Sequence, residues 1–552
     1  MKNILLSISM LSLLILFNSC SKNFLSQVPV AELSQDQILD SANVEGSVIA
    51  AYSVLGGQFN DASNAYNSPA SNWSFGDVVS DDCYKGGGGP GDQNGIQLME
   101  LFQTNPSVLD VGNKWLALYE GVKRANLAIQ LLNKVQNFDP ALKAERIGEM
   151  RFLLGHYYFE LKKIYNQIPY IPPTAVNLQD YYVSNTALSS DSLWAKIEED
   201  FKDAYSILPM NQTEPGRPTK MAAEAYLCKT YIYEKKWADA EAAADIVINS
   251  GKYQLMNNFG DVFLPQNNNN AESVFAIQYS INDGSPNNYG GDIGDRLLPP
   301  GGPFYPLYGF QRPSQNLVNA FKTDSNGLPL EDNIKLNASD YTDPRLDYTV
   351  GRQGIPYLDL GINYDSTWER DLADYGPYAP KKRIVSAKSP YYLNQWPWVN
   401  ALNYYVIRYA DVLLWKAEAA IELGDLETGR EYINMIRERA KNSQYIKTLD
   451  GSHYAANYKI DIYAQPFANQ QAAIFALRTE RRLEFALDGQ RFFDIVRWGI
   501  ADSVMNNYFA TESNIRPILT GAKFIASKNE YFPIPQQEVD LGHGLIKQNS
   551  GY

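Results

Sequence analysis

The spacing of apolar residues constrains the fold of this chain more than any other feature. Apolar side chains recur every three or four residues through two long blocks, at about 34–251 and 402–498. This period is typical of helices that bury one face. The clearest examples are the segments 114–132, 144–165, 193–208, 219–234 and 237–249. The sequence therefore predicts a mainly α-helical body.

The stretch between these blocks, at about 252–401, has a different character. It contains four consecutive asparagines at 267–270 and the run Pro-Pro-Gly-Gly-Pro at 299–303. Glycine and proline break helices and favour turns, and long loops on a helical scaffold usually carry function. We expect one body over 34–552, in which the helical blocks carry this loop-rich insertion and the chain ends in a segment at 499–552.

Two segments of the helical blocks, 219–251 and 406–440, resemble tetratricopeptide units. In the first, Cys228 and Ala240 fall near the spacing at which two helices of a repeat interlock, and Gly429 has a comparable place in the second. Neither segment matches the full repeat pattern, so we expect tetratricopeptide-like helical hairpins with a close crossing. Cys228 is then a small core residue rather than a reactive thiol.

The first residues of the chain have the form of a secretory leader. Lys2 precedes an apolar run at 4–17, which ends in Asn18-Ser19-Cys20. The run is shorter than the ~20 apolar residues that a membrane-spanning helix needs. A small residue directly before a cysteine is typical of lipoprotein processing. We expect a signal peptide over 1–19, a lipidated Cys20 and a tether over 20–33, with an ordinary secretory leader as the alternative.

The composition narrows the class of partner. The formal net charge is −14, and no basic block stands out, which disfavours nucleic acid and anionic lipid headgroups as partners. The 38 tyrosines, 9 tryptophans and 23 phenylalanines suggest exposed ring faces as well as a core. Only Cys83 and Cys228 remain beyond the leader. The chain is therefore no disulfide scaffold, and the spacing leaves open whether these two cysteines pair.

The sequence offers poor material for catalysis. Its only histidines are His156, His453 and His543, which are widely separated. The metalloprotease, nucleophile-elbow and phosphate-loop motifs are absent. We therefore expect no enzyme activity, no metal site and no cofactor, and we expect His156 to be a core or interface residue. A glycosidase pair of carboxylates is defined by separation in space, so counting residues does not exclude it.

Three aromatic loops have the composition of a sugar-binding surface. The first contains Trp73, Asp81, Asp82 and Tyr84, the second Tyr308 and Arg312, and the third Trp396 and Trp398. Aromatic rings stack on the C–H faces of sugars, while charged and polar groups hydrogen-bond to the hydroxyls. We take these eight as candidate ligand-binding residues. The alternative for each loop is that its rings pin it onto the body.

Several motifs, in order along the chain, resemble the SusD/RagB family of nutrient-binding proteins. They are Gly216-Arg217-Pro218-Thr219, Arg408-Tyr409-Ala410-Asp411, Glu480-Arg481-Arg482-Leu483-Glu484-Phe485, Gly489-Gln490-Arg491-Phe492-Phe493-Asp494 and Arg497-Trp498-Gly499. The charged residues of the last three motifs stand at spacings that allow carboxylate–guanidinium pairs between helical turns and between neighbouring helices. We expect these residues to hold the scaffold together rather than to bind ligand.

The resemblance implies a function. It indicates an outer-membrane lipoprotein that binds an oligosaccharide at the cell surface and delivers it, without catalysis, to a SusC-like TonB-dependent transporter. The strings at 81–87 and 276–284 also resemble members associated with fructan uptake. Three alternatives stay open, namely a surface glycoside hydrolase, a binder of peptides or another nutrient, and a structural partner of the transporter with no ligand.

Overall fold

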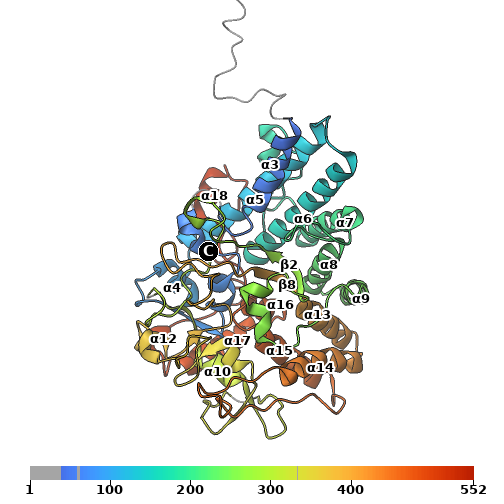
Figure 1. Ribbon diagram of the computed structural model, residues 1–552. Coiled ribbons are helices and arrows are strands. Elements are labelled where there is room, and N and C mark those ends of the chain that lie inside the picture. Colours follow the sequence, from blue (N-terminus) through green and yellow to red (C-terminus); the bar gives the residue numbers. More distant parts are fainter. Residues whose placement is uncertain (1–38, 59–61, 307, 332) are drawn as a thin grey trace, which may run out of the picture.

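The computed structural model describes residues 39–58, 62–306, 308–331 and 333–552. The expected signal peptide, the lipidated Cys20 and the tether lie outside these residues. The molecule is mainly helical (Figure 1). No helix in the described ranges combines the length and the apolar character that crossing a membrane requires.

The helices predicted from periodicity are present. They are α5 (Leu109–Lys134), α6 (Pro140–Tyr165), α7 (Ser190–Ile207), α8 (Lys220–Glu234), α9 (Trp237–Asn249), α13 (Tyr409–Glu422) and α14 (Leu426–Asn442). Successive helices pack against each other, and α9 packs on α13, so the two sequence blocks form one stack along one side of the molecule (Figure 1). The other helices are α3 (Ser41–Tyr52), α4 (Asn94–Glu100), α10 (Gln315–Ala320), α11 (Leu346–Thr349), α12 (Leu372–Tyr375), α15 (Gln470–Glu484), α16 (Arg491–Arg497), α17 (Ala501–Glu512) and α18 (Gln536–Leu541).

Both predicted hairpins are confirmed, with the close crossings that their small residues suggested. The Cys228 thiol lies 3.3 Å from the carbonyl oxygen of Ala240 on the next helix, and Cys228 is fully buried and unpaired. At Gly429 an added Cβ would lie 2.3 Å from the Ile421 side chain, so only glycine allows α14 to approach α13 this closely. His156 is also buried, as expected, and its ring nitrogen contacts the Tyr226 hydroxyl at 2.5 Å.

The chain between α3 and α5 and the insertion differ from expectation because they contain paired strands. β1 (Cys83–Gly86) pairs antiparallel with β3 (Phe310–Pro313), and β2 (Ser273–Ile277) pairs antiparallel with β8 (Tyr404–Arg408). Shorter pairs join β4 (Lys322–Thr323) to β5 (Tyr341–Thr342) and β6 (Val350–Gly351) to β7 (Ala379–Pro380). The two longer pairs join strands that are remote in the sequence, which periodicity cannot predict.

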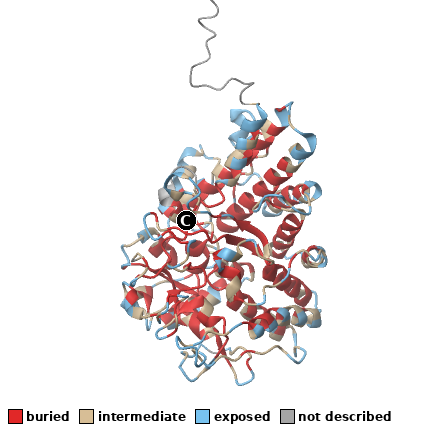
Figure 2. Ribbon diagram, in the orientation of Figure 1, coloured by how far each residue is buried: buried red, intermediate tan, exposed pale blue. Residues whose placement is uncertain are grey.

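The insertion shares a second apolar core with the chain between α3 and α5. Trp73, Phe310, Tyr357 and Trp368 belong to a buried cluster that is separate from the core of the helical stack. Figure 2 accordingly shows buried residues both in the helices and in the segments beside them. The insertion is therefore a packed layer on the scaffold, and only its outer turns are free to act as loops.

Two buried carboxylates of α15 join this layer to the stack. Glu484 accepts hydrogen bonds from Arg439 of α14 at 2.5 Å, from Arg408 of β8 at 2.8 Å and from Arg345 of the insertion at 3.1 Å. Glu480 accepts from Arg345 at 2.7 Å. All of these side chains are buried. The expected guanidinium pairs therefore exist, and they connect elements that are distant in sequence.

We predict that Glu484→Gln destabilises the protein strongly. The substitution keeps the shape of the side chain but removes a buried carboxylate that three guanidinium groups share, and although each keeps another carboxylate, breaking a buried pair costs about 3–5 kcal/mol. The free energy of unfolding in urea measures the loss. The control is Glu431→Gln on the exposed face of α14, where we expect a change within about 0.5 kcal/mol. Equal effects of the two variants would contradict a joining role for Glu484.

Candidate functional site

Five of the eight residues expected to contact a ligand are wrongly assigned, because the structure buries them. These are Trp73, Asp81, Asp82, Tyr84 and Arg312, none of which exposes more than 3 % of its surface. Their loops lie under other segments, so these side chains cannot contact a ligand at the surface. For these five residues the alternative interpretation applies, namely that they hold their loops onto the body.

The contacts of these five residues explain their burial. The Trp73 ring packs edge-on against Phe310 with the ring centroids 6.1 Å apart, and its indole N–H donates to the carbonyl of Gly294 at 3.1 Å. The Tyr84 hydroxyl donates to Glu512 of α17. The remaining three form ion pairs: Arg491 Nε with Asp81 at 2.8 Å, Arg482 Nε with Asp82 at 2.7 Å, and Arg312 Nη1 with Glu369 at 2.9 Å.

The environment of Asp81 sets its protonation. Burial alone would raise the pKa of this carboxyl, but the guanidinium groups of Arg482 and Arg491 lower it to about 2. An ordinary aspartate in an unfolded chain has a pKa near ~3.9. The ionised form is therefore favoured by folding, and its contribution to stability is present in full above the unfolded pKa and is lost as the pH falls toward 2.

We predict that the stability difference between wild type and Asp81→Asn depends on pH. The wild type is more stable at pH 6 and above, and the gap narrows by about 1 kcal/mol on acidification to pH 3, since the native carboxylate loses its advantage there. Urea unfolding at several pH values measures this gap. Asp239→Asn, on the exposed face of α9, is the control for replacing an aspartate without removing a buried ion pair, and we expect it to change stability by no more than about 0.5 kcal/mol. A constant gap for Asp81→Asn would refute the assignment.

The other three candidates come together at the surface. Trp396 and Trp398 meet at right angles with ring centroids 5.4 Å apart, and Trp398 meets Tyr308 with centroids 6.2 Å apart. Trp396 is 59 % exposed, whereas Trp398 and Tyr308 are half-buried. We call Tyr66, Tyr308, Trp396 and Trp398 the aromatic platform, with Tyr66 included for the reason that follows.

Arg296 supports this platform from below. Its guanidinium carbon lies 5.0 Å from the centroid of the Tyr66 ring and 5.2 Å from that of Trp396. Arg296 is 8 % exposed, and a largely desolvated cation between two ring faces attracts both. It therefore fixes the orientation of Trp396 and brings Tyr66 beside it. Sequence reasoning missed both residues, because neither stands in a segment with a distinctive composition.

Comparison with known proteins identifies the family. The model of the SusD family matches residues 271–552. The chain belongs to the SusD family. A second model, described as starch-binding and associating with the outer membrane, matches residues 90–232. These two matches cover much of the first helical block, the whole of the second and most of the insertion.

Individual relatives of this SusD-family protein agree. SusD-like protein P25 of Formosa agariphila is 22 % identical over 474 residues, which cover 80 % of each chain. A solved laminarin-binding SusD-like protein is 23 % identical, with a TM-score of 0.70 over 93 % of this chain and 99 % of that one. Surface glycan-binding protein A of Bacteroides thetaiotaomicron, solved with laminarihexaose, is 20 % identical, with a TM-score of 0.68 over 92 % and 99 %. These likenesses confirm the mainly helical SusD-like fold.

In this SusD-family protein, the acidic pair that stands out in the sequence does not have the geometry of a hydrolase site. Asp81 and Asp82 are buried and paired with arginines, so neither can reach a glycosidic bond. Within the described ranges, no three His, Cys, Asp or Glu side chains are grouped so as to hold a metal ion. Burial lowers the pKa of His156 to about 3, so the imidazole is neutral and enclosed. The aromatic platform, in contrast, offers ring faces on which a ligand can stack.

Proposed function

We propose that this SusD-family protein binds an oligosaccharide on the aromatic platform at the cell surface and delivers it to a SusC-like TonB-dependent transporter. One observation carries the proposal: the exposed Trp396 ring packs at a right angle against Trp398, and clustered apolar surface of this kind, unlike a single exposed ring, marks a binding site. Two perpendicular rings form a corner that can contact two faces of a sugar chain.

The rigidity of the platform favours binding. Trp398 donates its backbone N–H to the carbonyl of Gln395 at 2.6 Å, which closes a tight turn, and the side chain of Pro397 within this turn is buried. Arg296 holds the Trp396 ring from below. Side chains that are already ordered lose little rotamer freedom when a ligand arrives. Stacking at an exposed ring gives modest affinity, which suits a protein that must release its cargo.

Anchoring at the outer membrane is part of the proposal. The leader and Cys20 have the form of a lipoprotein signal, and the second matching family model is described as associating with the outer membrane. More than one acyl chain on a cysteine gives a stable anchor without a spanning helix. The transporter as partner follows from the family resemblance.

The kind of glycan is the finer part of the proposal. Two structural relatives are described as binding laminarin or laminarihexaose, whereas the strings at 81–87 and 276–284 resemble fructan-associated members. Asp81 and Asp82 lie in the first string and are buried, so that string carries no information about ligand contacts. Because the descriptions of two solved relatives outweigh the one string that remains, we rank a β-glucan such as laminarin above fructan as the cargo.

We predict that Trp396→Ala weakens glycan binding at least about tenfold, because it removes the most exposed stacking face of the platform. The measurement is calorimetric titration of protein that starts after Cys20 with laminarihexaose, maltohexaose and an inulin-type fructan. Tyr454→Ala is the matched control, since Tyr454 is also 59 % exposed but lies outside the platform. We expect it to bind like the wild type.

The outcomes separate the parts of the proposal. If no glycan binds the wild type, glycan binding is wrong. If glycans bind and both variants bind equally well, the platform is wrong. Release of reducing sugar during the titration would favour the hydrolase alternative, and binding of peptides in place of glycans would favour a different nutrient.

A further inference from the structure

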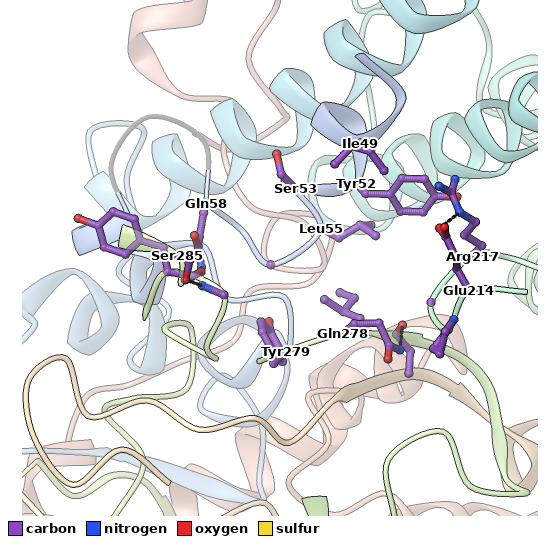
Figure 3. Close-up of a pocket in the computed structure, with 17 residues that line it drawn as sticks. Ile49, Tyr52, Ser53, Leu55, Gln58, Glu214, Arg217, Gln278, Tyr279 and Ser285 are labelled. Carbon is purple, nitrogen blue, oxygen red and sulfur yellow. Dashed lines mark hydrogen bonds and ion pairs between the residues drawn. The ribbon is translucent and has the colours of Figure 1, made fainter. Parts of the chain in front are cut away.

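We propose that a second saccharide site lies in the cavity beside α3. This cavity, called the α3 cavity, has a volume of about 470 Å³ and lies between α3, the loop at 214–217, the end of β2 and the loop at 285–290 (Figure 3). Binding pockets for small molecules usually have ~300–1,000 Å³ and mostly apolar walls with a few polar groups. The choice of a saccharide as occupant rests on the proposed function.

The polar group that points to a ligand is the hydroxyl of Tyr279. The Tyr279 side chain lines the cavity and is only 9 % exposed. Its backbone N–H donates to Asn403 at 3.0 Å, but its hydroxyl has no hydrogen-bond partner among the residues that the structure describes. The hydroxyl oxygen is not sealed off inside the protein but is open to the cavity, where it can donate to and accept from a ligand. The hydroxyl of a bound sugar would satisfy it, since a neutral phenol both donates and accepts.

The walls of the cavity are fixed in place. Gly216 has a φ of +87°, and a Cβ there would lie 2.4 Å from the Gln278 side chain, so only glycine allows this loop to approach β2. The Gln278 amide is held by Asn403 at 2.9 Å and by Asn269 at 2.8 Å. The cavity therefore exists before any ligand arrives, which reduces the cost of binding.

The charge around the cavity favours an uncharged occupant. Arg217 lines it but forms ion pairs with Glu149 at 2.7 Å, with Glu214 at 2.6 Å and with Glu45 at 3.1 Å. With three carboxylates around it, this guanidinium has no excess positive charge for an anionic ligand. The rings of Tyr52 and Tyr289 and the side chain of Ile49 supply apolar surface for the C–H groups of a sugar.

The α3 cavity lies within a short distance of the aromatic platform. Tyr289 lines the cavity and Arg296 supports the platform, and the seven residue steps from one to the other span at most about 25 Å. A polysaccharide long enough to reach both sites would bind them together, and its overall affinity would exceed that of either site alone. The second site would therefore act chiefly on long chains.

Substitutions that spare the platform test the second site. Tyr279→Phe removes only the hydroxyl without a partner, so the fold is retained, and we expect laminarihexaose to bind the cavity about three- to tenfold more weakly. Ile49→Trp places a larger ring in the mouth of the cavity from a position that is 49 % exposed. Ile246→Trp on α9, at 42 % exposed, is its matched control.

Each variant is titrated with laminarihexaose, maltohexaose and an inulin-type fructan, alone and in combination with Trp396→Ala. We expect Trp396→Ala to leave residual binding, which Ile49→Trp then abolishes and Ile246→Trp leaves intact. If Trp396→Ala abolishes all binding, or if Ile49→Trp and Tyr279→Phe leave the residual binding unchanged, the second site is wrong and the platform stands. Loss of binding in the cavity variants but not in Trp396→Ala would support the second site and overturn the platform. If none of the three glycans binds the wild type, both sites fail.

Discussion

The pairing of two buried carboxylates on α15 with arginines from three other parts of the chain determines how the molecule is assembled. Burial alone would raise the pKa of Glu484, but Arg439, Arg408 and Arg345 together hold it well below its usual range. Removing such charges from water costs several kcal/mol per ion, and a single pair seldom offsets that cost. The network is therefore favourable only when α14, β8 and the insertion are all in place.

The platform depends on this assembly. Its four rings come from three segments that are far apart in the chain, and the insertion supplies Tyr308, Trp396 and Trp398. Their angles are reproducible only if the insertion is packed firmly against the stack, since a loose layer would let the rings rotate independently. Within the layer, the buried contacts of Trp73 with Gly294 and of Arg312 with Glu369 hold the segments together. Residues expected at the ligand surface thus hold the surface-forming segments in place.

Sequence reasoning succeeded where the information is local. The stacked helices α5 to α9 and both hairpins follow from the spacing of neighbouring residues, as does the contact between Arg481 and Asp494, at 3.0 Å. The short helices α10 to α12 lie in the insertion, where the sequence indicated loops. It failed for strand pairs such as β1 and β3, whose partners are remote. For the site, composition identified aromatic and acidic loops but could not give their orientation. Rings with hydrogen-bonding neighbours suit both a sugar and a packed interior, so Trp73 and Trp396 look alike in the sequence although one is buried and the other exposed.

The aromatic platform and the α3 cavity would together determine how the ligand is captured and released. A protein that hands its ligand onward cannot rely on one very tight site, because most gains in affinity come from slower dissociation. Two weak sites that bind the same long glycan retain it by multivalency, whereas a glycan bound at one site alone dissociates quickly. A glycan that is shortened or drawn inward until it contacts only one site would no longer be retained by multivalency. Length-dependent affinity is therefore the physical property that best fits retention at the surface followed by transfer.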